Sequence, residues 1–196
     1  ISSHIGINVE VDNDCVIIHQ ESYINKLIEK FNIDESKQVA TPMIERLLSK
    51  QDEIISSPVD PTKYQEIIGS LVYASTTTRP DIALATSVLG RFAAKPFKIH
   101  YTAARRVLQY LASTKKYGIK YCVASNLVLE CHGDSDWAGD PSSRKSTSGY
   151  LFTLGSGPIA WRSCKQKCVA LSSAEAEYVA ASEAAKEAIY LRNVLS

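Results

Sequence analysis

The chain has 196 residues, and its 22 Lys and Arg against 21 Asp and Glu leave a formal net charge of +1. Hydrophobic residues make up 45% of it, which is enough for a packed core and argues against wholesale disorder. No apolar run is long enough to cross a membrane and no secretory signal opens the chain. The length allows one large domain or two small ones. Because the first residue is Ile1 rather than Met, we expect a piece of a longer polypeptide.

The cysteines are odd in number and scattered: Cys15, Cys122, Cys131, Cys164 and Cys168. In a chain of this size, which does not need covalent links to fold, this pattern favours reduced thiols in an intracellular compartment. An alternative is a zinc site built from Cys131, His132, Cys164 and Cys168, although the spacing of these residues is irregular.

Charge is unevenly distributed along the chain. Residues 59–124 carry 10 Lys and Arg against 3 Asp and Glu, whereas residues 1–58 carry 5 against 10 and residues 125–196 carry 7 against 8. A basic middle segment is a candidate surface for nucleic-acid phosphates. The alternative is a solvated helix face whose charges balance the acidic N-terminal part.

The first part of the chain predicts a hairpin, a helix and a linker. Residues 5–11 and 15–18 have strand-like patterns on either side of the turn at 12–14. Ser22 is placed to cap the helix that follows, and residues 44–61 are polar and interrupted by proline, which is typical of a linker.

Three helices are expected next, because apolar residues recur at helical spacing in blocks separated by Pro80 and Pro96. Asp60 or Thr62 lies where the first of these helices would begin. The basic side chains between the apolar positions are the candidate nucleic-acid-binding residues: Arg91, Lys95, Lys98, Arg105, Arg106, Lys115 and Lys116.

The last part of the chain predicts a strand over residues 127–131 that runs into Asp134, followed by a hairpin over residues 150–161. Residues 169–171 are candidates to extend the second arm of this hairpin. A long helix should begin near Ser172, where Ser172-x-x-Glu175 matches a capping box.

Two carboxylates are the leading candidates for metal binding, Asp134 at the end of the strand and Glu177 in the first turns of the long helix. Helical spacing places Glu177 on the same face as Ala180, Ala184 and Leu191, so we expect it on the buried stripe. A buried carboxylate needs a metal, a cation or strong hydrogen-bond donors. The alternative is a hydrogen bond to the backbone or a pair with an arginine. The other nearby acidic residues are expected in turns, in a cap or in solvent: Asp136, Asp140, Glu175, Glu183 and Glu187.

A series of motifs in this last part resembles the ribonuclease H region of copia-type retrotransposon Pol polyproteins: residues 134–140, 144–150, 161–163 and 169–178. Earlier motifs resemble the end of the adjoining reverse transcriptase: residues 6–9, 41–43, 64–73, 78–82 and 108–114. The resemblance covers nearly the whole chain, in order and with the expected spacings.

This resemblance implies an α+β protein, with a helical thumb- and connection-like segment followed by part of a ribonuclease H-like α/β domain of three strands and one long helix. The implied segments are 1–58, 59–124 and 125–196. Asp134 and Glu177 match the family's first catalytic aspartate and its catalytic glutamate. They would hold Mg²⁺ or Mn²⁺ for hydrolysis of the RNA strand in an RNA–DNA hybrid.

The implied partners are that hybrid or other nucleic acid, together with the upstream polymerase and the integrase regions of a parent polyprotein. The family's polymerase aspartates and its later catalytic carboxylates are expected outside these 196 residues, so we expect no polymerisation and impaired cleavage. Two alternatives remain, a non-catalytic nucleic-acid-binding module and an inactive remnant of an element.

Overall fold

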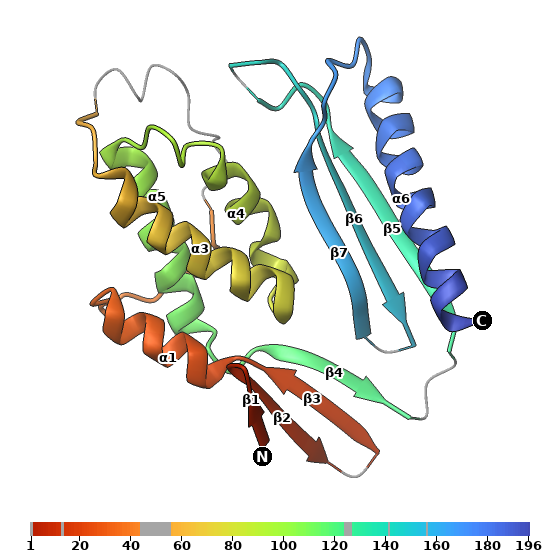
Figure 1. Ribbon diagram of the computed structural model, residues 1–196, viewed down its shortest axis with the longest axis horizontal. Coiled ribbons are helices and arrows are strands. Elements are labelled where there is room, and N and C mark those ends of the chain that lie inside the picture. The colour runs from red at the N-terminus through yellow and green to blue at the C-terminus, as the bar shows by residue number, and fades with distance from the viewer. Residues whose placement is uncertain (1, 13, 44–55, 124–126, 141, 156) are drawn as a thin grey trace. The chain divides into compact units, whose positions relative to one another are not determined.

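The computed structural model describes residues 2–12, 14–43, 56–123, 127–140, 142–155 and 157–196. The chain divides into two compact units, Ile1–Ser125 and Asn126–Ser196 (Figure 1). The first unit combines several helices with an antiparallel sheet and the second combines one described helix with another, so the protein is a mixed α and β protein. Across the described segments, we find no helix with the length and apolar character that a membrane crossing requires.

The first unit contains a four-stranded sheet in the order β1-β2-β3-β4. Its strands are β1 (Ser2–His4), β2 (Ile7–Asp12), β3 (Cys15–His19) and β4 (Gly118–Cys122). The hairpin predicted from the sequence is confirmed as β2 and β3, which pair from Asn8↔His19 to Asp12↔Cys15. The strands β1 and β4 were not predicted, because both are short and β4 pairs with a strand about a hundred residues earlier in the chain.

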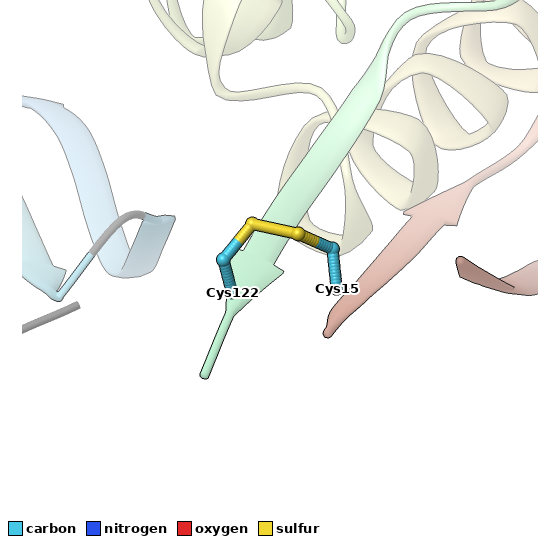
Figure 2. The surroundings of a disulfide bond; sticks show 2 residues. All are labelled: Cys15 and Cys122. Carbon is cyan, nitrogen blue, oxygen red and sulfur yellow. A yellow bond between two sulfur atoms is a disulfide. The ribbon is translucent and has the colours of Figure 1, made fainter. Parts of the chain in front are cut away.

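A disulfide joins Cys15 of β3 to Cys122 of β4 (Figure 2). The expectation that all five cysteines are reduced thiols is therefore wrong for this pair. The two residues are direct partners in the β3–β4 ladder, with their Cα atoms 4.1 Å apart. Since 107 positions separate them in sequence, cysteine spacing could not reveal the link. Cys131, Cys164 and Cys168 are free.

The helices of the first unit share one hydrophobic core. They are α1 (Glu21–Lys30), α3 (Pro61–Thr77), α4 (Ala83–Gly90) and α5 (Lys98–Ser113), with a short 3-10 helix, η1 (Pro80–Ile82), before α4. The three helices predicted between residues 59 and 124 are confirmed. Asp60 caps α3 by accepting a hydrogen bond from the Thr62 backbone N–H at 2.9 Å.

The predicted cap at Ser22 is wrong, because α1 begins one residue earlier and has no side-chain cap. Ser22 instead lies in the first turn, where its backbone N–H donates to Asn8 Oδ1 at 3.2 Å and its hydroxyl accepts from Asn8 Nδ2 at 3.0 Å. A side chain from β2 thus supplies the acceptor that a capping residue would otherwise provide. The predicted linker at residues 44–61 lies largely outside the described residues.

The second unit is a three-stranded sheet in the order β5-β6-β7, with one long helix packed on it (Figure 1). Its elements are β5 (Leu129–Asp136), β6 (Thr147–Leu154), β7 (Gly157–Lys165) and α6 (Ser173–Leu195). The predicted order of strand, hairpin and helix is confirmed. Residues 169–171 do not extend β7; the indole N–H of Trp137 instead donates to the Ala170 carbonyl at 3.1 Å and fixes this segment as a loop.

Candidate functional site

The start of α6 is fixed by two hydrogen bonds. The Ser172 hydroxyl accepts from the Glu175 backbone N–H at 3.1 Å, and a Glu175 carboxylate oxygen accepts from the Leu171 backbone N–H at 2.7 Å. The capping role predicted for Ser172 and Glu175 is confirmed, although Glu175 reaches the residue before Ser172. These bonds set where the next turn begins, and Glu177 lies in that turn.

Glu177 is exposed, so its predicted place on the buried stripe is wrong. The residues that α6 buries are Ala176, Ala180, Ala184 and Leu191. Two of these and Phe152 of β6 form a small core. Residues 176 and 177 differ by 100° around a helix, so burial of Ala176 places Glu177 on the flank of the contact. Because alanines lie on both sides of the stripe, the sequence did not determine whether residue 176 or residue 177 is buried.

Glu177 lines a groove of about 330 Å³ between α6 and β5. The strand contributes Cys131 and Gly133, and the helix contributes Glu177 and small side chains that leave the groove open: Ala181, Ala184, Ala185 and Ala188. Within the described sheet β5 is an outer strand, so one of its edges is unpaired. The groove therefore combines an apolar wall and one carboxylate.

Asp134 lies on β5 directly after Gly133 and is exposed. Its Oδ1 atom accepts a hydrogen bond from the Ser135 backbone N–H at 2.8 Å. Successive side chains of a strand point to opposite faces of the sheet. Because Gly133 faces Ala184 of α6, the Asp134 side chain projects from the face that α6 does not cover. The two predicted metal ligands therefore lie on elements that contact one another, Asp134 on β5 and Glu177 on α6, and of the two it is Glu177 that lines the groove.

Carboxylate oxygens are the ligands that Mg²⁺ and Mn²⁺ prefer, so the chemistry of these two side chains fits such an ion. Over the part of the chain that the structure describes, no three His, Cys, Asp or Glu side chains gather closely enough to hold a metal ion. The zinc alternative is therefore wrong, because Cys131, His132, Cys164 and Cys168 do not form such a group.

Asp140 has a structural place instead of a metal-binding one. Its buried carboxylate accepts from Lys165 Nζ at 2.6 Å and from the backbone N–H groups of Ser142 and Ser143 at 3.0 and 2.9 Å. Burial alone would raise the pKa of Asp140, but the bonds from Lys165, Ser143 and Ser142 outweigh it and hold the pKa well below its usual range. The ionised carboxylate thereby fastens the loop after β5 to the end of β7.

The remaining glutamates of α6 are less solvated than expected. Glu183 and Glu187 are half-buried. A Glu183 oxygen accepts from the Cys164 thiol at 3.3 Å, and a Glu187 oxygen accepts from the Tyr150 hydroxyl at 3.4 Å. The solvated role predicted for both is wrong, because the sheet presents thiol and hydroxyl groups toward that side of the helix.

The basic residues proposed to bind nucleic acid fall into two groups. Arg105 donates to the carbonyls of Phe31 and Asn32 at 2.9 and 3.0 Å, Arg106 donates to the Thr41 hydroxyl, and Lys115 pairs with Glu35 at 2.9 Å. These three and Arg91 are half-buried. The exposed members of the set are Lys95, Lys98 and Lys116. The phosphate-binding capacity of this block therefore depends on fewer free cations than the sequence suggested.

Sequence reasoning missed Cys131 and Gly133 as parts of the groove. A Cβ atom at Gly133 would lie 3.9 Å from the Ala184 side chain, which is an ordinary contact distance, so Gly133 faces α6 across the groove. The pattern of a glycine directly before an acidic residue on a strand was the available signal.

Comparison with known proteins relates this chain to transposon polyproteins. It is 44% identical over 184 residues to the retrovirus-related Pol polyprotein from transposon TNT 1-94 of Nicotiana tabacum, covering 91% of this chain and 14% of that protein. It is 35% identical over 191 residues to the putative transposon Ty5-1 protein of Saccharomyces cerevisiae, covering 95% of this chain and 61% of that protein. No family model matches the chain, and no solved structure matches it significantly.

A further relative is the secreted RxLR effector protein 161 of Plasmopara viticola, with 50% identity over 128 residues that cover 65% of this chain and 90% of that protein. Over nearly all of its length the chain is thus similar to part of retrovirus-related Pol polyproteins from transposons. It corresponds to a fragment of such a polyprotein, spanning about one seventh of the length of the tobacco relative.

Proposed function

We propose that this chain is the part of a Pol polyprotein that joins the end of a reverse transcriptase to a ribonuclease H-like unit, and that its second unit contributes to hydrolysis of RNA in RNA–DNA hybrids. The observation that supports the proposal is that β5, which carries Asp134, and α6, which carries Glu177, pack against each other, with Glu177 lining the groove between them. Both carboxylates are exposed, so both are accessible to a cation and a phosphodiester.

Asp134 and Glu177 are the residues that would hold Mg²⁺ or Mn²⁺. When bound there, the ions would activate water and stabilise the leaving oxygen of the cleaved strand. Asp134 takes a fixed orientation from the Ser135 amide, and Glu177 takes its place from the capped first turn of α6. The alanines make the helix side of the groove apolar.

Two-metal hydrolysis needs more ligands than these two, because bridging and flanking groups hold the ions about 3.5–4 Å apart. Since no third ligand side chain joins Asp134 and Glu177 within the described residues, the chain supplies part of a site. We therefore propose that the 196-residue chain cleaves poorly, and that a version extended along its parent polyprotein cleaves well.

A labelled RNA–DNA hybrid incubated with Mg²⁺ or Mn²⁺ tests this function. The extended version should cleave the RNA strand, and Asp134→Asn and Glu177→Gln should each abolish that cleavage. Asp136→Asn serves as the matched control on the same strand and should leave most activity. Cleavage that survives both Asp134→Asn and Glu177→Gln would show that the site lies elsewhere.

A second candidate function is binding of nucleic acid without cleavage, which the exposed Lys95, Lys98 and Lys116 favour. These side chains carry charge into solvent in a segment with 10 Lys and Arg against 3 Asp and Glu. Retained hybrid binding by an extended version that does not cleave would select this function over the first.

A further inference from the structure

Gln166 is a buried amide outside the groove just described. It follows β7 directly, and its own backbone N–H donates to the Ser146 carbonyl at 2.8 Å, which fixes it against the start of β6. Its side chain is only 1% exposed. A buried amide is kept where its hydrogen bonds connect parts of a structure, because burial of an unpaired polar group is costly.

The side-chain nitrogen of Gln166 joins the sheet to the helix. It donates to the Ser148 hydroxyl of β6 at 2.9 Å and to the Ala176 carbonyl of α6 at 2.9 Å. Ser148 lies directly opposite Ser135, the residue after Asp134. Ala176 is the residue before Glu177. One amide therefore links the strand pair that carries Asp134 to the helical turn that carries Glu177.

We propose that Gln166 is a positioning residue that sets the place of Glu177 relative to Asp134. This inference rests on the metal-binding role proposed for that pair. The contact stripe of α6 in this region is made of alanines, whose small side chains interlock little with a sheet and resist sliding weakly. The two directional hydrogen bonds from Gln166 fix the position of α6 along the sheet, which the alanine contacts alone do not.

The substitution Gln166→Met keeps the length and apolar volume of the side chain and removes both donated bonds. Lys165→Met is the matched control: it changes the neighbouring residue to the same side chain and breaks a partly buried bond, from Lys165 to Asp140 at 2.6 Å. That bond fastens the loop after β5 and does not reach α6. Both variants are made in the full 196-residue chain.

Hydrogen exchange measures the positioning directly and needs no metal. In Gln166→Met, we expect the amides of residues 176–181 to lose protection about fivefold, as the loss of one typical buried hydrogen bond implies. Amides near Leu191 should keep their protection in this variant. In Lys165→Met, all amides of α6 should keep theirs. Unchanged protection of residues 176–181 in Gln166→Met would overturn the inference, whatever the metal experiment shows.

Mn²⁺ binding, followed by the electron paramagnetic resonance signal of the free ion, measures the consequence. Asp134→Asn and Glu177→Gln should each weaken binding to the chain, and Gln166→Met should weaken it about tenfold, as is typical when a group that orients a ligand is lost. Lys165→Met should leave it unchanged. Equal affinities in Gln166→Met and the original chain would overturn the positioning role.

Failure of the proposed function has a different signature. In that case the original chain, Asp134→Asn and Glu177→Gln would all bind Mn²⁺ equally or not at all, while the hydrogen-exchange result would still decide whether Gln166 holds the first turns of α6.

Discussion

Arg79 places a guanidinium group in the interior of the first unit, with only 1% of the residue exposed. It donates to both Asp81 oxygens, at 3.0 and 2.7 Å, and to the carbonyl and hydroxyl of Thr114 at 3.1 and 2.6 Å. The Tyr110 hydroxyl donates to Asp81 Oδ2 at 2.8 Å, and the Tyr110 ring lies 5.5 Å from the guanidinium. Through these hydrogen bonds, residues 79–81 connect η1 to the end of α5.

Asp81→Asn should destabilise the first unit by about 2 kcal/mol, because it leaves the Arg79 charge buried without its counter-charge while the Thr114 contacts remain. Urea denaturation followed by circular dichroism measures the loss. Asp34→Asn is the control, since Asp34 is exposed and its hydrogen bonds stay within its own turn. Equal small effects of both substitutions would show that the Arg79 network adds nothing to stability.

Asp140 should make the second unit sensitive to acid. Its pKa is lowered in the folded protein, so the stability it contributes is present above the unfolded-state pKa of about 3.9 and is lost as pH falls below that value. Unfolding of this unit measured between neutral pH and pH 2 should show that loss. In Asp140→Asn the stability of this unit should be lower at neutral pH and should change less between neutral pH and pH 2. An unchanged dependence of stability on pH would show that Asp140 is not the group responsible.

At the scale of elements, local sequence patterns predicted the helices and hairpins that residues close in sequence determine. The β2–β3 hairpin, the helices α3 to α5, and the order of strand, hairpin and helix in the second unit follow from periodicity and turn residues. The strand β4 and the link from Cys15 to Cys122 depend on pairing across 107 positions, which no local pattern contains. Ser22 was mistaken for a cap because the true acceptor, Asn8, comes from another element.

The candidate site shows the same division. Asp134 and Glu177 were found from their positions on a strand end and a helix start, and the structure places them on β5 and α6. The exposure of Glu177 was not predictable, because a stripe of alanines on a helix leaves the orientation of that helix undetermined by about one residue. Gln166 was missed for a related reason: its partners, Ser148 and Ala176, lie on two other elements.

The disulfide between β3 and β4 should be a major source of stability in the first unit. It closes a loop of about a hundred residues, and a link of that span restricts the unfolded chain by about 4.7 kcal/mol in the chain-entropy account. Thermal unfolding with and without a reducing agent should show a clear fall in Tm on reduction. The double variant Cys15→Ser, Cys122→Ser should match the reduced protein and not respond to the reductant; a response would point to Cys131, Cys164 or Cys168.

At the scale of the whole molecule, the net charge of +1 conceals a basic segment, residues 59–124, within a nearly neutral chain. Part of that charge is engaged within the protein, since Arg105, Arg106 and Lys115 bond to the segment after α1. Substituting these residues would change both folding and binding. The exposed lysines Lys95 and Lys98 allow the two effects to be separated.

We therefore expect the chain to bind RNA–DNA hybrid through its phosphates, with affinity that falls steeply as salt rises. Lys95→Gln with Lys98→Gln should weaken binding and reduce the slope of log affinity against log salt by about 2, one for each lost phosphate contact. Lys26→Gln with Lys186→Gln removes the same charge from exposed positions outside this segment and is the matched control. Fluorescence anisotropy of a labelled hybrid at several salt concentrations gives the slopes. Identical slopes for both double variants would mean that only total charge matters and that residues 59–124 hold no binding surface.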